Sequence, residues 1–130
     1  MRKSFLFLSL LFFIADTHAH PDDDIFTVTN KTSQNLCIRA VGEGKDEQDG
    51  STPQWRVQSE IEVGQKKIFK RKELGDAFQK KQIKLRKITN LGISLDGTQK
   101  ENEHVLKLSH SLNRTFVITD AFLRHLGLIK

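Results

Sequence analysis

Short runs of alternating apolar and polar residues recur along the chain, and this pattern restricts its fold more than any other feature. Residues 25–30, 36–41 and 115–119 are rich in β-branched and aromatic side chains, which favour strands. Similar runs occupy residues 54–63, 66–71, 82–89, 93–95 and 105–108. The spacing predicts an all-β fold, an antiparallel β-sandwich (immunoglobulin-like) of about seven short strands. A ferredoxin-like α+β fold is the alternative, but it requires two long amphipathic helices that the sequence lacks.

The segments between the runs predict the local connections. The polar residues 31–35 indicate a hairpin that pairs strand 25–30 with strand 36–41, and residues 105–108 are predicted to pair with 115–119. Residues 42–53 contain glycines and acidic residues without a large apolar side chain, which indicates a long solvated loop. Residues 72–81 suit a short helical turn or a wide loop, and residues 90–92 a turn. Asp120 is the expected cap of a short C-terminal helix that ends at Gly127.

The N-terminus has the three parts of a secretory signal peptide. A cationic start, Met1 to Ser4, precedes an apolar run over residues 5–15, and Thr17-His18-Ala19 has small residues at its outer positions. As a helix the run covers only about half of a ~30 Å hydrocarbon core, so we expect no transmembrane anchor. We therefore expect cleavage near Ala19 and a secreted or periplasmic protein. The predicted organisation is residues 1–19 as signal peptide, 20–24 as a flexible acidic tail and 25–130 as one β-sandwich domain.

Cys37 is the only cysteine, so the chain has no intramolecular disulfide. Small exported domains often depend on disulfides, and this one must instead rely on its core, a ligand or an oligomer. Leu36 and Ile38 flank Cys37, which indicates a buried and unreactive thiol. An intermolecular disulfide is the alternative.

Charge is unevenly distributed along the chain. The sequence has 21 basic and 16 acidic residues, and removal of Arg2, Lys3 and Asp16 with the leader changes its net charge from +5 to +4. Residues 21–62 hold nine acids and four bases, whereas residues 63–87 hold ten bases and two acids. The basic segment supplies the candidate binding residues, which are Lys66, Lys67, Lys70, Arg71, Lys84, Arg86 and Lys87.

If residues 66–72 and 80–87 form adjacent strands, their side chains merge into one basic face. Such a face attracts an anionic envelope component, such as lipopolysaccharide or phospholipid headgroups, or an acidic protein surface. The alternative is a solvated face that only maintains solubility. Export and the few interleaved aromatic residues disfavour nucleic acid as the partner. The acidic segment Glu43 to Asp49 is a second candidate surface, and it allows self-association by contact with the basic face of another copy.

The expected mature terminus provides a different candidate. The amine and imidazole of an N-terminal His20 would form a chelating pair for copper. This arrangement resembles the copper-binding end of exported copper carriers and of lytic polysaccharide monooxygenases, which are also β-sandwiches. The resemblance implies a further histidine ligand, for which His104, His110 and His125 are available, and Asp22 to Asp24 offer oxygen ligands. A disordered polar tail is the alternative interpretation.

Hydrolytic chemistry has little support in the sequence. Ser109 and His110 are neighbours in a predicted strand, where adjacent side chains point to opposite faces. The sequence contains no nucleophile-elbow, phosphate-loop or metalloprotease motif. The sequence thus predicts an exported, non-catalytic binding protein with a basic face. A copper-binding domain and a structural subunit of a secretion or surface assembly are the alternatives.

Overall fold

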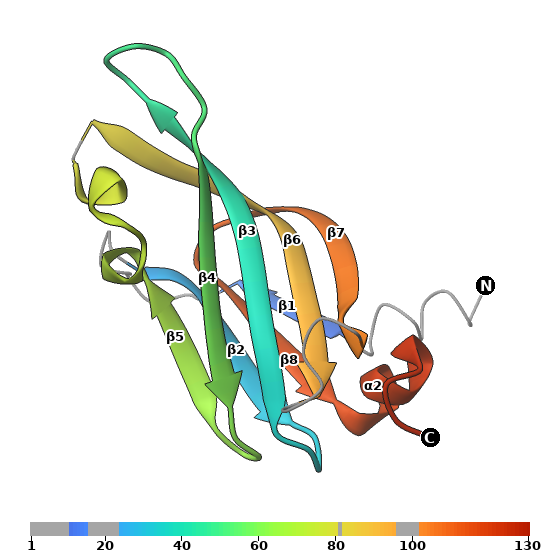
Figure 1. The fold of residues 1–130 in the computed structure, drawn as a ribbon. Coiled ribbons are helices and arrows are strands. Elements are labelled where there is room, and N and C mark those ends of the chain that lie inside the picture. The colour runs from blue at the N-terminus through green and yellow to red at the C-terminus, as the bar shows by residue number, and fades with distance from the viewer. Residues whose placement is uncertain (1–10, 16–23, 81, 96–101) are drawn as a thin grey trace.

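The computed structural model describes residues 11–15, 24–80, 82–95 and 102–130, and these residues form mostly β-structure (Figure 1). The chain begins with strands β1 (Leu11–Ala15), β2 (Asp24–Lys31), β3 (Leu36–Asp46), β4 (Gln54–Ile61) and β5 (Lys66–Lys70). Two short 3₁₀ helices, η1 (Arg71–Glu73) and η2 (Asp76–Gln79), follow. The remaining elements are β6 (Ile83–Leu95), β7 (His104–Ser111), β8 (Arg114–Thr119) and helix α2 (Asp120–Leu126).

The strands form two four-stranded sheets. One has the order β1-β8-β2-β5 and the other the order β4-β3-β6-β7. The predicted all-β class with one short C-terminal helix is thereby confirmed. The immunoglobulin-like part of the prediction is not confirmed, because the first, second, fourth and fifth strands of an immunoglobulin domain share one sheet, whereas β4 lies here in the sheet of β3, β6 and β7. None of the helices in the described segments is long and apolar enough to cross a membrane.

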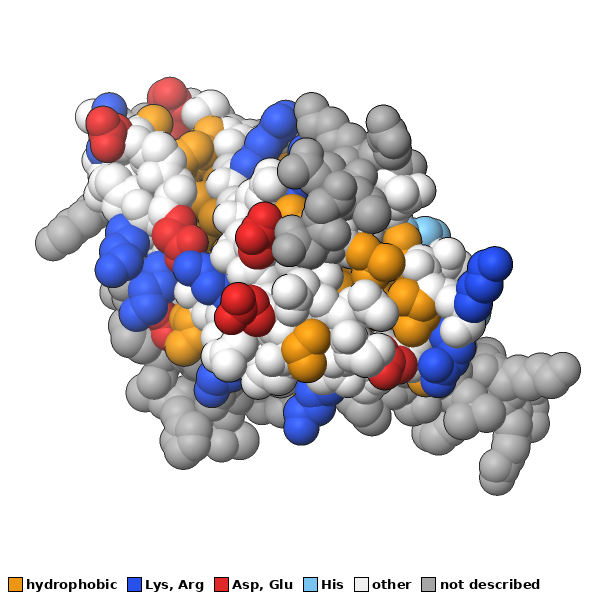
Figure 2. Space-filling view, turned by 60° about the horizontal axis from the view of Figure 1, so that its bottom comes forward, with side chains coloured by type: hydrophobic (Ala, Val, Ile, Leu, Met, Phe, Trp, Pro, Cys, Tyr) orange, Lys and Arg blue, Asp and Glu red, His pale blue; other side chains and the backbone are white. Residues whose placement is uncertain are grey.

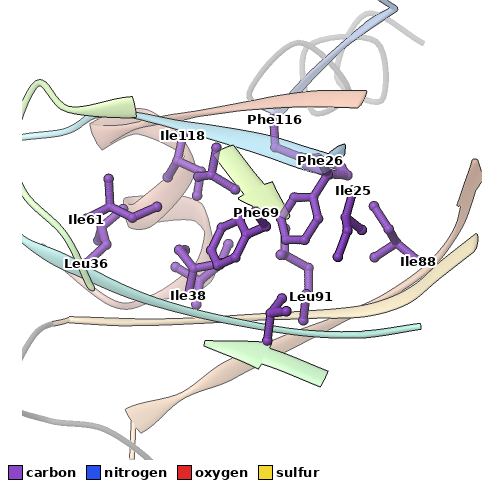
Figure 3. Close-up of a cluster of buried hydrophobic side chains, with 14 of the residues drawn as sticks. Ile25, Phe26, Leu36, Ile38, Ile61, Phe69, Ile88, Leu91, Phe116 and Ile118 are labelled. Atoms are coloured by element: carbon purple, nitrogen blue, oxygen red, sulfur yellow. The ribbon is translucent and has the colours of Figure 1, made fainter. Parts of the chain in front are cut away.

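Strand pairing differs from the prediction at both expected hairpins. β2 pairs with β5 and β8, and its pairing with β8 is parallel, so the sheet is not purely antiparallel. β3 lies in the other sheet, and β7 and β8 are likewise divided between the two sheets. The chain crosses from one sheet to the other between β2 and β3. Phe26 of β2 and Ile38 of β3 therefore enter the same core from opposite sides (Figure 3). A hairpin would have placed both strands in one sheet.

A buried asparagine holds the crossing between β2 and β3. The Asn30 side chain is fully buried, and its Nδ2 donates to the carbonyls of Gln34 at 2.8 Å and Ile61 at 2.9 Å. Its Oδ1 accepts hydrogen bonds from the backbone N–H and the hydroxyl of Thr32. Because both donors and the acceptor of the amide have partners, its burial does not leave an unpaired polar group. The network joins the turn after β2 to the end of β4.

The hydrophobic core draws residues from both sheets and from α2. Figure 3 shows labelled core side chains lying between the strands of the two sheets. Phe26 stacks on Phe69 with ring centroids 4.5 Å apart, and it meets Phe116 edge to face at 5.8 Å. Such aromatic pairs add to the free energy of burial. Trp55 is 1% exposed within this core.

The central strands are longer than predicted. β3 continues through Gly42 and Gly44 to Asp46, so residues 42–46 of the expected loop 42–53 are strand. Any side chain at position 42 would overlap the Trp55 indole and the carbonyl of Lys87. Gly42 therefore lies where β3 comes very close to the Trp55 ring of β4 and to the backbone of β6. β6 also passes straight through the predicted turn at residues 90–92, where Leu91 is fully buried.

The short helices agree with the sequence, with one change of cap. The two 3₁₀ turns span residues 71–79, which agrees closely with the helical turn or wide loop expected for residues 72–81. Thr119, not Asp120, caps α2, since its side chain accepts a hydrogen bond from the Phe122 N–H at 3.2 Å. Asp120 instead accepts hydrogen bonds from the N–H and the hydroxyl of Ser33. Gly127 ends α2 with φ of 81°, as predicted.

Cys37 is a buried thiol, as predicted. It alternates with Leu36 and Ile38, so it lies on the opposite face of β3 from the core. The Gln58 side chain donates a hydrogen bond to the Cys37 sulfur, with 3.6 Å between Nε2 and Sγ. Burial raises the pKa of the Cys37 thiol, despite a hydrogen bond with Ser94 that acts in the opposite direction. The thiol is therefore protonated and weakly nucleophilic at neutral pH.

We expect Gly42→Ala to lower the free energy of unfolding by about 1–3 kcal/mol, because its methyl group must displace the Trp55 ring or the β6 backbone. Chemical denaturation measures the change. Gly75→Ala is the matched control: Gly75 has φ of −65° and no atom near the added methyl group, so its stability should change by less than about 0.5 kcal/mol. Equal stability of the two variants would contradict the close approach at Gly42.

Candidate functional site

The seven predicted basic residues occupy two separate regions. The first, here called the β5 cluster, comprises Lys66, Lys67, Lys70 and Arg71. The second, called the β6 cluster, comprises Lys84, Arg86 and Lys87 together with Lys45 on the paired strand β3. β5 and β6 lie in different sheets, so the adjacent strands on which a single basic face depended are not formed. Figure 2 views the lower end of the molecule, where basic and acidic side chains are interspersed.

Most side chains of the β5 cluster already make ion pairs or hydrogen bonds within the molecule. Lys67 lies 3.1 Å from Glu73 and over the Phe69 ring, 5.6 Å from its centroid. Lys70 lies 3.6 Å from Asp24. The carboxylate beside each of these two lysines partly neutralises the field of its ammonium group. The cluster is therefore a weak attractor for a further anion.

Arg71 has a structural role. Its guanidinium donates hydrogen bonds to the carbonyls of Phe78, Lys80 and Ile83. These acceptors span η2 and the start of β6, so one side chain joins the two 3₁₀ turns to the opposite sheet. Its five fixed donors suit this bridging. The same donors are unavailable to an external ligand while the bridge is intact.

The β6 cluster is exposed by a β-bulge. Glu43 pairs with Lys87 and Gly44 with Leu85, so Arg86 is an additional residue in β6 without an opposite partner. A bulge breaks the alternation of side chains and redirects those at its position. Arg86 and Lys87 are accordingly both exposed although they are consecutive in a strand. Lys45 and Lys84 stand directly opposite each other next to the bulge and are also exposed.

Two surface hollows meet at Arg86. The larger one, of about 570 Å³, is lined by Lys45, Glu47, Lys84, Leu85 and Arg86. The second, of about 340 Å³, is lined by Glu43, Gly44, Thr52, Arg86, Lys87, Ser109, His110 and Ser111. Guanidinium, ammonium and hydroxyl groups together can donate hydrogen bonds to phosphate or carboxylate oxygens. This end of β3 and β6, at the top of Figure 1, is the candidate anion-binding site.

The acidic segment Glu43 to Asp49 lies beside the β6 cluster in the same molecule. Asp46 accepts hydrogen bonds from the N–H groups of Gln48 and Asp49, and Asp49 accepts one from Ser51. Hydrogen bonds from the Ser51 hydroxyl and from the Ser51 N–H lower the pKa of the Asp49 carboxyl. Glu47 lies 3.7 Å from Lys84. The segment thus forms its own turn and moderates the charge of the β6 cluster.

The predicted copper ligand His20, with Asp22 and Asp23, lies outside the described residues. His104 and His110 are on β7, and His125 is on α2. Within the described segments no group of three or more histidine, cysteine, aspartate or glutamate residues is arranged to hold a metal ion. The copper hypothesis therefore stays a prediction about the N-terminus.

Lys45 is the basic residue of the site that the sequence analysis missed, because the segment around it was interpreted as a loop. The alternation of Leu36, Ile38 and Ala40 continues through Gly42 and Gly44, and treating the glycines as inward-facing positions would have extended the strand to Lys45. The bulge at Arg86 has no comparable signal in the sequence. Known protein families, curated proteins and solved structures offer no match to this chain.

His110 contributes a partly buried imidazole to the second hollow. Its ring meets Phe116 edge to face, with centroids 6.3 Å apart. Burial, assisted by the positive charge of Arg114, lowers the pKa of His110 below its ordinary value. The imidazole is therefore neutral at pH 7, and the positive charge of the hollow comes from Arg86 and Lys87.

The lowered pKa of His110 predicts that acid destabilises the fold. Below about pH 6.5 the histidine of the unfolded chain binds a proton before the folded one does, so the free energy of unfolding falls as the pH decreases. Urea denaturation at pH 7.5 and 5.5 measures this loss. His110→Gln should reduce the difference between the two pH values, whereas the exposed control His104→Gln should retain it. An unchanged difference in His110→Gln would contradict the assignment.

Proposed function

We propose that this chain is an exported, non-catalytic binding protein whose β6 cluster contacts a phosphate-bearing anionic component of the cell envelope. The observation that carries the proposal is the bulge at Arg86. It exposes two consecutive basic side chains beside Lys45 and Lys84, where two hollows meet. Bulges commonly re-aim side chains at binding sites.

The chemistry of the hollows supports an anionic headgroup. Arg86 offers a planar fork that matches two phosphate oxygens, and Lys87 adds a mobile point charge. Thr52, Ser109 and Ser111 line the same hollow and supply hydroxyl donors. Glu43 and Glu47 reduce the net charge, which favours a ligand that makes specific hydrogen bonds over general attraction to any polyanion.

Export is part of the proposal, and its support is the sequence of residues 1–19. We also infer that the two sheets form a β-sandwich, because residues of both sheets belong to one buried cluster. A rigid core of this kind suits a binding protein, since it fixes the strands that present the β6 cluster. An acidic protein surface is the alternative partner.

We expect Arg86→Glu/Lys87→Glu to weaken binding to vesicles that contain anionic phospholipid or lipopolysaccharide. Each basic residue near such a surface contributes about 1 kcal/mol, so the double variant should lose at least about 2 kcal/mol, roughly thirtyfold in affinity, and repulsion of the two glutamates adds to the loss. Vesicle co-sedimentation of the exported protein measures the loss. Binding of the unchanged chain should also weaken between low and physiological salt.

Lys66→Glu/Lys72→Glu is the matched control, because it changes the net charge equally at two exposed lysines outside the β6 cluster. Its affinity should remain within about threefold of the unchanged chain. Equal losses in the two double variants would show that only net charge matters. Binding to an acidic protein but not to anionic vesicles would favour the alternative partner.

A further inference from the structure

An apolar N-terminal segment occupies one edge of the first sheet. β1 pairs antiparallel with β8, from Leu11 opposite Ile118 to Ala15 opposite Arg114. β8 therefore has neighbours on both sides, since β2 pairs with its other edge. Residues 11–15 belong to the predicted leader, and its removal would leave the backbone groups of β8 without a partner along that edge.

The sequence of β8 is that of an interior strand. Its central residues, Thr115 to Thr119, are β-branched or aromatic, without lysine or proline, and its pairing with β1 and β2 contains no bulge. Proteins usually protect true edges with charges, prolines or bulges. The edge strand β5 follows that rule with three lysines, and β7 carries Lys107. β8 lacks such protection.

The neighbouring strand of the other sheet adds apolar surface. His110 on β7 contacts Phe116 on β8, so this face of β7 is directed toward β8. Leu106 and Leu108 alternate with His110 on the same face and are only partly buried, even with β1 in place. The edge of β8 is thus bordered by apolar side chains that an added strand would cover further.

We propose that removal of the leader opens the β8 edge, and that β8 of a second copy docks there antiparallel to form a twofold dimer. The two copies would then share one continuous sheet in the order β5-β2-β8-β8-β2-β5. β1 shows that the edge accepts an antiparallel strand. A twofold axis makes identical strands antiparallel, which satisfies both edges with one contact. The inference rests on the export part of the proposed function and is independent of the β6 cluster.

Charge selects the register of the two strands. Arg114 begins β8 and Asp120 directly follows it. When the pairing is centred on Val117, residues 115–119 of the two copies face one another, and Arg114 of each copy lies at the end of the ladder beside Asp120, the first residue of α2, in the other copy. The attraction between these opposite charges at both ends of the ladder favours that register over its neighbours.

The test uses the full chain, exported and processed by a bacterial host, with its N-terminus verified by mass spectrometry. Sedimentation over a concentration series should show a dimer that dissociates on dilution. Val117→Lys places a charge on the proposed edge and should give a monomer with an unchanged circular dichroism spectrum. Ile68→Lys, at an exposed residue of β5, is the matched control and should remain dimeric.

A cross-link tests the register independently of the charge variants. In a Cys37→Ser background, Val117→Cys should form an intermolecular disulfide, because directly opposite residues have Cα atoms about 4.5–5.5 Å apart. Thr115→Cys should not, because residue 115 would lie opposite residue 119 and about 13 Å from its own counterpart.

Three results would overturn the proposal: a monomer at all concentrations, a dimer that survives Val117→Lys but not Ile68→Lys, or an N-terminus that retains residues 11–15. An assembly larger than a dimer would overturn the twofold arrangement. Vesicle binding by the Arg86→Glu/Lys87→Glu variant is a separate measurement, so failure of the dimer and failure of the anion-binding site are distinguishable.

Discussion

The pairing of β3 with β6 is the constraint on which both the core and the candidate site depend. The two strands pair from Leu36 and Leu95 at one end to Asp46 and Ile83 at the other. At the first end this register directs Ile38 and Ile93 into the core, and near the other it brings the β6 backbone close to Gly42. The bulge that exposes Arg86 belongs to the same ladder. Stability and the presentation of charge are therefore coupled through one strand pair.

Basic residues that are close in sequence have different functions in the fold. Arg71 bridges three backbone carbonyls, and Lys67 and Lys70 lie beside carboxylates. Arg86 and Lys87 project into solvent at a bulge. Charge density along the sequence is thus a poor measure of the field that a partner meets, because the fold neutralises one part of the basic segment and displays the other.

The alternation of side chains predicted most of the residues that form strands. The sequence did not predict which strands pair. Residues 31–35 have the composition of a hairpin turn, but the Asn30 network redirects the chain into the other sheet. Gly42 and Gly44 resembled loop residues because their role, close approach to Trp55 and β6, depends on a contact between distant segments. The basic residues were predictable as a set, whereas their division between two sheets depends on the same non-local pairing.

The N-terminal apolar run links export to the assembly of the fold. A run of consecutive apolar residues suits both a leader and a buried strand. β1 pairs with β8, the strand whose edge is least protected by charges, prolines or bulges. Once the run is removed, the outward N–H and C=O groups of β8 must be satisfied by water or by another strand. Water satisfies the backbone but leaves Val117 and the apolar border of β7 exposed. A second β8 covers both at once, and for that reason the dimer is the arrangement that the composition of this edge favours.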